Sequence, residues 1–481
     1  MSERLEVDLL VIGSGPAGQK AAIQAAKAGC RVALIERLKE VGGACVHSGT
    51  IPSKALREKA LQLSRARQIG NAFELGLAAD VPFAKLLDGV EQVIAAHDRY
   101  MLEQLERNGI RCVRGRAEFK SPQLVNVQRI DGTSFDVEAR RVVIATGSRP
   151  RQPPEITLDH EHILDSDSIL ALAYLPRSLI VIGAGVIACE YASTFAALGC
   201  VVTQIDRAER PLAFLDVELS TRYTDALLAF GGTFHGQRIA VRATWDGVAQ
   251  VAVVLDDGTV LHADKVLVAQ GRIANVERLG LEAAGVRLTT RGLIEVDDEL
   301  RTSSPSIYAA GDVIGPPALA SAAMEQGRRA ARHALGLLAG AGHDLLPTGI
   351  YTIPEIATVG LDEAAACAKW GSAVVGRAEF REVARGHIAG VQDGFLKMVS
   401  DPEGRALVGV QVIGDGATEL VHVGQMGLAA GATIDQFVDN VFNFPTLAEA
   451  YRVAALDIVK RRGATAEQSV VARARTASPE R

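Results

Sequence analysis

Small residues at a fixed spacing carry the first chemical signal in this sequence. In the stretch VDLLVIGSGPAGQKAAIQAAKAGCRVALIER, Gly13, Gly15 and Gly18 satisfy the pattern GxGxxG. The first glycine allows a tight turn, the second lets the backbone approach a pyrophosphate, and the third permits close packing of a helix on a strand. Glu36 ends the second strand of this βαβ unit, where a carboxylate accepts hydrogen bonds from ribose hydroxyls. The segment predicts a dinucleotide site.

The same arrangement occurs a second time, 170 residues downstream. The stretch SLIVIGAGVIACEYASTFAALGCVVTQID places Gly183, Gly185 and Ala188 at the small positions and Asp206 at the terminal acid. The interval from the first glycine to the acid is 23 residues in both copies. Two dinucleotide sites in one chain indicate a carrier that stays bound and a substrate that exchanges.

The preferred nucleotide at the second site is left open by its residues. Asp206 suits the free ribose hydroxyls of NAD and repels the 2′-phosphate of NADP. Arg207 and Arg210 follow directly, and guanidinium groups pair well with phosphate. The alternative is that both arginines are solvated loop charges.

Two short strands follow the two glycine-rich units. RRVVIATGSRP ends in Ala145, Thr146 and Gly147, and DKVLVAQGRIA ends at Gly271. Each lies where a returning strand of the same nucleotide fold would lie, so we expect these residues at the cofactor sites.

A third strand, Ile307 to Ala310, ends in Gly311 and Asp312 before a helix expected to start near Ala320. A carboxylate here suits the hydroxyls of a flavin's ribityl chain, while the helix N-terminus faces the phosphates. A lone Gly-Asp is also a common helix cap. Its position after two nucleotide units favours the cofactor role.

Bulk properties exclude several classes of function. With 481 residues, 48% hydrophobic residues and a formal net charge of -6, the chain fits a multi-domain globular protein that binds small molecules. It has no basic block before the extreme C-terminus, so its composition gives no reason to expect nucleic-acid binding. Its six cysteines are scattered, without a disulfide framework or a metal-binding cluster. The short apolar run near the N-terminus does not fit a signal peptide, and no stretch is long enough to span a bilayer. We expect a cytoplasmic protein.

These signals together predict an α/β fold with two Rossmann-like dinucleotide-binding domains. The first would use residues 1–150 and 274–346, and the second residues 151–273. Beyond them, short β-like runs followed by helices predict a C-terminal α+β domain over 347–465. Residues 466–481 contain few large apolar side chains and are expected to form a disordered tail.

The chain resembles the flavoprotein disulfide reductases, the group of dihydrolipoamide dehydrogenase and glutathione reductase, through the ordered motifs GSGPAG, GGACVHSGTIPSKALR, ATG, GAGVIACEYA, GD and FPTLAEAYRVAA. In that family two cysteines spaced CxxxxC form a redox disulfide, and a His before Pro-Thr acts with a Glu as an acid-base pair. Here Cys45 fills the first cysteine position and Thr50 the second, and Phe444 replaces the His while Glu449 remains. Reduction of disulfide substrates is therefore not expected.

With these departures, and through TIPSKALR, LASAAMEQGR and PTGIYTIPEI, the chain resembles the soluble, Si-specific pyridine nucleotide transhydrogenases. The resemblance implies hydride transfer between NADPH and NAD+ with FAD as the intermediate carrier. It also implies a homodimer or larger homo-oligomer built through the C-terminal domain. Lys54 and Glu190 match a lysine beside the flavin's reactive nitrogen and its carboxylate partner, and Gly43 and Cys45 match positions at the flavin.

Several alternatives stay open at this point. The same flavin could pass electrons to a quinone or dye, or the chain could be a non-catalytic flavoprotein that senses nucleotide redox state. Lys54 and Glu190 could be solvated helix charges. Thr50 either donates a hydrogen bond near the flavin or fills the space of a thiol.

Overall fold

The computed structural model describes residues 4–73, 83–338, 340 and 345–476; within these, only the backbone is described at 71, 72, 84 and 463–476. The chain divides into two compact units. The first comprises Met1–Ile182 and Ala240–Gly342, and the second Gly183–Ile239 and His343–Arg481.

A parallel sheet forms the centre of the first unit. β1 (Arg4–Ile12) pairs with β2 (Val32–Glu36) on one side and with β6 (Ser134–Ile144) on the other. β2 pairs with β3 (Arg111–Arg114), and the end of β6 pairs with β17 (Ile307–Ala309). The strand that precedes ATG and the strand that precedes Gly-Asp, both predicted, are therefore neighbours whose carboxyl ends reach the same edge of the sheet.

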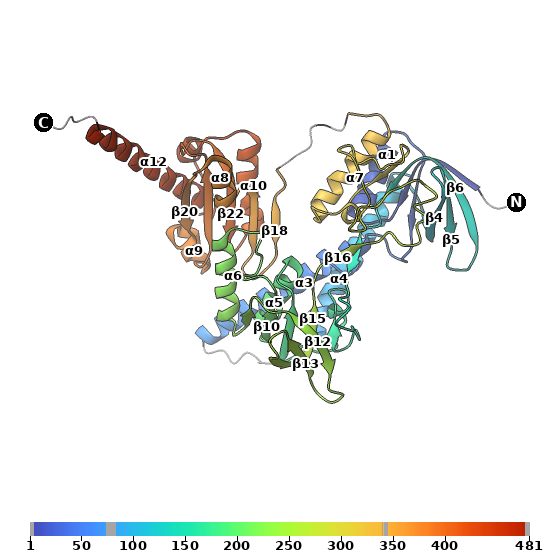
Figure 1. The fold of residues 1–481 in the computed structure, drawn as a ribbon, viewed down its shortest axis with the longest axis horizontal. Coiled ribbons are helices and arrows are strands. Elements are labelled where there is room, and N and C mark those ends of the chain that lie inside the picture. Colours follow the sequence, from blue (N-terminus) through green and yellow to red (C-terminus); the bar gives the residue numbers. More distant parts are fainter. Residues whose placement is uncertain (1–3, 74–82, 339, 341–344, 477–481) are drawn as a thin grey trace. The chain divides into compact units, whose positions relative to one another are not determined.

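Both faces of this sheet are buried, as its runs of apolar residues require. Leu9 lies in one apolar core, which α1 (Pro16–Lys27) and α7 (Ala320–Ala334) cover, and Leu10 lies in the core of the opposite face. The two helices pack so closely that a Cβ at Gly327 would lie 2.0 Å from the carbonyl oxygen of Ala17 (Figure 1). α7 begins at Ala320, which confirms the predicted helix start.

The other elements of the first unit connect and flank these parts. β15 pairs in parallel with β8 and β9, and it is the returning strand that was predicted before Gly271. The elements are α2 (Gly43–His47), α3 (Thr50–Ala72), α4 (Phe83–Arg107), β4 (Arg116–Ser121), β5 (Leu124–Gln128), β7 (Ser148–Pro150), β8 (Ile163–Leu164), η1 (Ile169–Ala171), β9 (Ser178–Ile182), β12 (Ala240–Trp245), β13 (Val251–Leu255), β14 (Val260–Ala263), β15 (Lys265–Val268), β16 (Arg272–Ala274) and η2 (Asp312–Ile314).

The second unit begins at the second glycine-rich turn. α5 (Val186–Leu198) leads into β10 (Val201–Ile205), which pairs in parallel with β11 (Thr233–His235). α6 (Val217–Ala229) connects these two strands. This is the helix-strand order that the second fingerprint predicts.

The rest of the second unit is a mixed α+β structure, as predicted from the short β-like runs and the helices that follow Pro347. Its antiparallel sheet has the order β18-β19-β22-β21-β20, and helices α10, α11 and α12 contribute to the apolar core on one face. The elements are β18 (Thr348–Ile350), β19 (Ile356–Gly360), α8 (Glu363–Trp370), β20 (Val374–Glu379), η3 (Phe380–Glu382), α9 (Ala384–Ala389), β21 (Phe395–Ser400), β22 (Leu407–Ile413), α10 (Ala417–Ala429), α11 (Ile434–Asp439) and α12 (Glu449–Thr476).

Helix α12 extends further toward the C-terminus than the sequence predicts. Residues 466–476, which we expected in a disordered tail, continue helix α12; residues 477–481 lie outside the described part of the chain. The lack of large apolar residues argues against burial, whereas helix propensity depends on Ala, Glu, Gln and Arg, which this segment contains. None of the helices within the described ranges is both long and apolar enough to cross a bilayer.

Candidate functional site

The first glycine-rich segment, the GxGxxG fingerprint Gly13–Gly18, forms a tight turn. Its glycines leave room for neighbouring backbone atoms and for a ligand. Gly13 has φ +102°, and a Cβ there would lie 2.3 Å from the carbonyl oxygen of Ala145. A Cβ at Gly18 would lie 1.9 Å from the carbonyl oxygen of Gly13. Gly15, the N-cap of α1, faces open space, where the nearest atom to a Cβ would be 4.0 Å away. The first and third glycines thus allow close packing, and the second leaves room for a phosphate at a helix N-terminus.

Glu36 is held beside this turn by donors from two directions. Its Oε2 accepts hydrogen bonds from the Ser14 amide at 2.9 Å and the Ser14 hydroxyl at 2.6 Å, and its Oε1 accepts one from the Leu38 amide at 2.9 Å. The Ser14 hydroxyl oxygen also accepts from the Gly42 amide at 3.0 Å. Ser14 therefore links the terminal acid to the turn that leads to Gly43. Sequence reasoning passed over Ser14 because it occupies a variable position of the fingerprint.

The segment Ala145–Gly147 is fixed in place by Asn275, another residue that sequence reasoning missed. The Ala145 amide donates to the Ile12 carbonyl at 2.8 Å, which extends the sheet to this point. The Asn275 side chain donates to the Thr146 carbonyl at 2.9 Å, and the Thr146 hydroxyl donates to the Asn275 carbonyl at 2.8 Å. The predicted ATG motif therefore lies beside Gly13, at the carboxyl edge of the sheet.

Asp312 lies at the same edge, after β17. Its Oδ2 accepts a hydrogen bond from the Ser148 hydroxyl at 2.6 Å, and the Ser148 oxygen accepts from Arg272 Nε at 2.7 Å. The Gly311 amide donates to the side chain of Gln326 on α7 at 2.9 Å. Gly311 has φ +83°, a conformation that favours glycine. The structure thus brings Gly13, the ATG segment and Asp312 together, as a single cofactor site requires.

Cys45 and Thr50 are hydrogen-bonded neighbours at the junction of α2 and α3. Burial raises the pKa of the Cys45 thiol; the Thr50 hydroxyl and the Lys54 ammonium act in the opposite direction with smaller effect. A thiol with a raised pKa carries little thiolate at neutral pH and is a poor nucleophile. Thr50 therefore occupies the position of a second thiol and contacts the first one, without forming a redox pair.

Lys54 lies one turn further along α3, with its Nζ 3.4 Å from the Ser53 hydroxyl. Glu190 belongs to the second unit. It is 7% exposed on α5, and its Oε1 accepts a hydrogen bond from the backbone amide of Tyr351 at 2.9 Å. Ser193, one turn later, accepts from the Ile353 amide at 3.1 Å. Through Glu190 and Ser193, α5 thus binds the backbone of the segment Tyr351–Ile353. This segment is part of the motif PTGIYTIPEI, which did not predict the contact.

The second fingerprint repeats the geometry of the first. Gly183 has φ +125°, and its amide donates to the Ile205 carbonyl at 2.8 Å, the same distance as the bond from Gly13 to Ile35. Gly185 is the N-cap of α5, and a Cβ there would meet nothing within 4 Å. Ala188 is fully buried. This turn also leaves space for a phosphate at a helix N-terminus.

The two arginines after Asp206 have different surroundings. Asp206 Oδ1 accepts a hydrogen bond from the Ala208 amide at 2.7 Å, which bends the chain back after β10. Arg210 is engaged within its own loop, since it donates to the carbonyls of Ala213 and Leu215 at 2.8 and 2.9 Å. Arg207 is exposed. Of the two arginines considered from sequence, Arg207 is therefore the more exposed to solvent.

Phe444 and Glu449 show why only half of the family's acid-base pair remains. Phe444 is 70% exposed. Glu449 opens helix α12, where its Oε2 accepts a hydrogen bond from the Thr446 amide at 3.2 Å. A carboxylate at a helix N-terminus stabilises the helix without any catalytic partner. Retention of Glu449 therefore carries no evidence for proton transfer.

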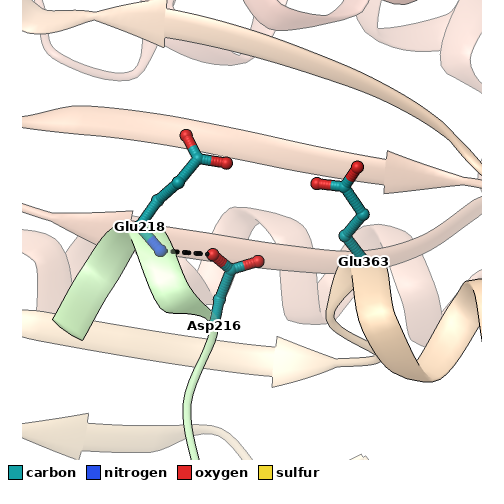
Figure 2. Close-up of side chains that lie close together, drawn as sticks. All are labelled: Asp216, Glu218 and Glu363. Atoms are coloured by element: carbon teal, nitrogen blue, oxygen red, sulfur yellow. Dashed lines mark hydrogen bonds between the residues drawn. The ribbon is translucent and has the colours of Figure 1, made fainter. Parts of the chain in front are cut away.

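Three carboxylates converge elsewhere in the second unit, from Asp216, Glu218 and Glu363 (Figure 2). Such a group resembles a cation site. The ammonium of Lys397 is within 2.7 Å of an oxygen of each of them, so a protein cation already occupies the centre of the cluster. The arrangement is an ion-pair network.

The comparisons with known proteins agree with this geometry. Residues 7–327 match the family model described as pyridine nucleotide-disulphide oxidoreductase, and residues 346–455 match the dimerisation domain of the same family. A soluble pyridine nucleotide transhydrogenase of Marinomonas sp. (strain MWYL1) is 43% identical over 94% of this chain and 97% of its own. One of Yersinia pestis (strain Pestoides F) is 41% identical over 96% of this chain and 100% of its own.

Solved structures share the fold. LpdA from Mycobacterium tuberculosis superimposes with a TM-score of 0.87 at 28% identity, over 94% of this chain and 99% of its own. The HOCl-induced flavoprotein disulfide reductase RclA from Escherichia coli has a TM-score of 0.84 at 25% identity, over 93% of this chain and 99% of its own. The predicted α/β class is confirmed.

Proposed function

Because the chain belongs to the pyridine nucleotide-disulphide oxidoreductase family, we propose that it transfers a hydride between NADPH and NAD+ through bound FAD. The observation that carries the proposal is the combination of two complete dinucleotide turns with a Cys45–Thr50 pair that forms no disulfide. The relatives named soluble pyridine nucleotide transhydrogenase support the same activity.

The first unit fits FAD. Gly15 leaves phosphate space at the N-terminus of α1, Glu36 is oriented by Ser14, and Asp312 lies at the same sheet edge as the ATG segment. When bound, FAD accepts a hydride from one nicotinamide and passes it to another, an exchange that takes up and releases no proton overall. A Phe at position 444 and a protonated Cys45 are compatible with that chemistry.

The remaining site residues receive roles within this proposal. The ammonium of Lys54 stabilises negative charge that develops on the flavin ring, and the Thr50 hydroxyl orders Cys45 beside it. Gly43 allows the close approach of its turn to Gly15, since its Cβ would lie 3.1 Å from the Gly15 Cα. Gly271 and the Gly183–Ala188 turn belong to the nicotinamide-nucleotide domain, for which we retain residues 151–273.

Asp206 and Arg207 together suit a site that accepts both nucleotides. The Asp206 carboxylate serves the free ribose of NAD(H), and the exposed guanidinium of Arg207 serves the 2′-phosphate of NADP(H). Each group weakens what the other favours, and a transhydrogenase needs moderate affinity for both nucleotides rather than selectivity for one.

We also propose a homodimer formed through the C-terminal domain, residues 347–465, in the cytoplasm. The match to a dimerisation domain supports it, as do exposed large apolar side chains in the same domain, Met426, Val441 and Phe444. All six cysteines are free, in keeping with a reducing compartment.

Steady-state kinetics test the proposed activity. With NADPH as donor and thio-NAD+ as acceptor, initial rates at several fixed donor concentrations should give parallel double-reciprocal lines, because the two nucleotides react in turn through the same FAD. Intersecting lines would contradict transfer through a reduced carrier. Turnover with a quinone but not with thio-NAD+ would assign the chain to dye or quinone reduction instead.

A further inference from the structure

The loop between Asp206 and Asp216 carries Arg207, the residue assigned above to the 2′-phosphate. It is anchored in three places. The Leu212 amide donates to the carbonyl of Ala184, within the second glycine-rich turn, at 2.9 Å. Leu212 is fully buried with φ +49°, so the loop is held in a conformation that a leucine rarely adopts. Arg210 is the second anchor, because its guanidinium donates to the backbone carbonyls of Ala213 and Leu215 within the loop.

The third anchor is Asp216, where the loop ends and α6 begins. Asp216 Oδ1 accepts from the Glu218 amide at 2.9 Å and caps the helix, and Asp216 Oδ2 accepts from Lys397 Nζ at 2.7 Å. Lys397 lies on β21 and its side chain is 1% exposed. Asp216 lies within the match to the oxidoreductase family model, residues 7–327. Lys397 lies within the match to the dimerisation domain, residues 346–455. The bond therefore joins two domains within the second unit.

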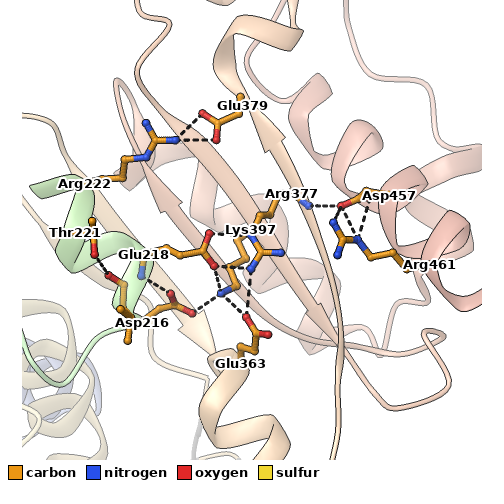
Figure 3. A network of polar contacts seen from close by, with 11 residues as sticks. Asp216, Glu218, Thr221, Arg222, Glu363, Arg377, Glu379, Lys397, Asp457 and Arg461 are labelled. Carbon is orange, nitrogen blue, oxygen red and sulfur yellow. Dashed lines mark hydrogen bonds and ion pairs between the residues drawn. The ribbon is translucent and has the colours of Figure 1, made fainter. Parts of the chain in front are cut away.

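Lys397 is the centre of a larger network (Figure 3). Its ammonium also lies 2.6 Å from Glu218 Oε1 and 2.7 Å from Glu363 Oε2. Arg377 on β20 donates to both oxygens of Glu218, at 2.8 and 2.5 Å, and lies 3.4 Å from Glu363. Burial alone would lower the pKa of Lys397, but hydrogen bonds to the three carboxylates outweigh it and raise the pKa above its ordinary value.

The three carboxylates differ in the number of cations that they contact. Without Lys397, Glu218 and Glu363 would still have Arg377 as a cationic partner, at 2.5 and 3.4 Å. Among the ion pairs of the described residues, that of Asp216 is with Lys397 alone. Removal of Lys397 would leave Asp216, 7% exposed, close to two other carboxylates without its cation. An uncompensated buried charge is strongly unfavourable. We therefore expect Asp216 to shift toward water and to move the end of the loop with it.

We propose that Lys397 is a positioning residue through which the C-terminal domain fixes loop 207–215 for binding the adenosine 2′-phosphate of NADP(H). It contacts no nucleotide and acts through Asp216. The proposal rests on the proposed function, in which Arg207 of this loop binds the 2′-phosphate of NADP(H).

The test compares three variants of the full-length, FAD-containing protein. Lys397→Met removes the cation and keeps the apolar stem. Asp216→Asn keeps the oxygen that caps α6 but replaces the oxygen that accepts from Lys397 with an NH2 group, which cannot accept a hydrogen bond; Lys397 retains Glu218 and Glu363. Arg222→Met is the matched control, because Arg222 also joins α6 to the C-terminal domain, through Glu379 at 2.8 Å, but lies further along the helix.

Two readouts separate positioning from stability. Calorimetric titration with 2′,5′-ADP measures binding to the loop without turnover, and NADPH-dependent dye reduction measures KM and kcat separately. For Lys397→Met we expect a rise of about tenfold or more in the Kd for 2′,5′-ADP, with a similar rise in KM for NADPH and a kcat within about threefold of wild type. Asp216→Asn should show a smaller change in the same direction, and Arg222→Met should bind within about twofold of wild type.

Wild-type affinity in a Lys397→Met protein with normal circular dichroism and FAD content would overturn the proposal. If Lys397→Met does not fold, Asp216→Asn decides, since unchanged 2′,5′-ADP binding by that variant overturns it equally. Equal losses in Arg222→Met and Lys397→Met would show a general clamp on α6 and also reject a role specific to the loop. Failure of the wild type to bind 2′,5′-ADP would first reject the use of NADP(H), and the positioning role with it.

Discussion

At the residue scale, one substitution decides the class of chemistry. Thr50 stands where a second thiol would complete a redox pair, and its hydroxyl contacts the Cys45 sulfur. Because burial raises the pKa of Cys45, the remaining thiol is protonated at neutral pH. The electrons that enter the protein therefore have one carrier, the flavin.

We predict that the protein takes up two electrons per FAD in an anaerobic dithionite titration, because no disulfide accepts a second pair. Cys45→Ala should keep transhydrogenase activity within about threefold of wild type, since the thiol only packs. Uptake of four electrons per FAD, or loss of most activity in Cys45→Ala, would show that Cys45 has a redox role.

A second prediction concerns Arg207. Arg207→Leu should raise KM for NADPH by about tenfold or more, the worth of a charge-assisted hydrogen bond to phosphate, and change KM for NADH by less than about twofold. Arg210→Leu is the contrasting variant. Because Arg210 holds the carbonyls of Ala213 and Leu215, its loss should weaken binding of both nucleotides. Equal KM values for NADPH in wild type and Arg207→Leu would remove Arg207 from the site.

At the scale of elements, the site consists of the carboxyl ends of parallel strands and the turns that follow them. The fingerprint glycines were predictable because each has a steric reason visible in its spacing. Ser14, Ser148, Arg272 and Asn275 were not, since they act through contacts between segments distant in sequence, and no local pattern encodes those contacts. Tyr351 was missed for another reason, because it donates to Glu190 through its backbone amide, a contact that the type of side chain does not predict.

Gly18 gives a prediction for the first turn. Gly18→Ala should yield protein largely without FAD, because the new Cβ would lie 1.9 Å from the Gly13 carbonyl oxygen and force α1 away from the turn. Gly29→Ala is the control: its φ of +83° makes alanine unfavourable by about 1 kcal/mol, but a Cβ there meets nothing within 4 Å. The FAD absorbance per chain checks both. Full FAD occupancy in Gly18→Ala would contradict the packing argument.

The Lys397 network makes the second unit sensitive to acid. The hydrogen bond from Arg377, helped by Lys397 and opposed by burial, lowers the pKa of Glu218 to about 2 from its ordinary value of 4.5. A carboxylate with a lowered folded-state pKa contributes stability above its unfolded pKa, and this contribution is lost as the pH falls from about 4.5 toward about 2.

The corresponding measurement is the difference in Tm between wild type and Glu218→Gln. Wild type should be the more stable at about pH 6. The difference should shrink as the pH is lowered toward about 3, because Glu218 of the unfolded chain takes up a proton below about pH 4.5 while Glu218 of the folded chain stays ionised. A difference in Tm that stays constant over this range would show that the ion pairs of Glu218 do not contribute as the structure indicates.

At the scale of the whole molecule, the repeated fingerprint was enough to predict the α/β class and two nucleotide sites. The boundaries of compact units were less accessible. The second unit combines Gly183–Ile239 with the C-terminal part of the chain, and ion pairs such as Lys397–Asp216 join residues of these two segments that are far apart in sequence. The pattern of hydrophobic residues along the chain does not predict such pairs. Low apolar content predicts disorder from residue 466 onward, whereas helix α12 extends to Thr476, because helix propensity does not depend on apolar content.

The central claim is that one FAD passes a hydride from NADPH to NAD+ without help from a thiol. The most direct test is a single turnover under anaerobic conditions: reduce the purified protein with one equivalent of NADPH, remove free nucleotide, add NAD+, and follow flavin and nicotinamide absorbance together. We predict that the oxidised flavin spectrum returns as one equivalent of NADH per FAD appears, in wild type and in Cys45→Ala alike. Flavin that stays reduced with NAD+ but reoxidises when a quinone is added would contradict the account.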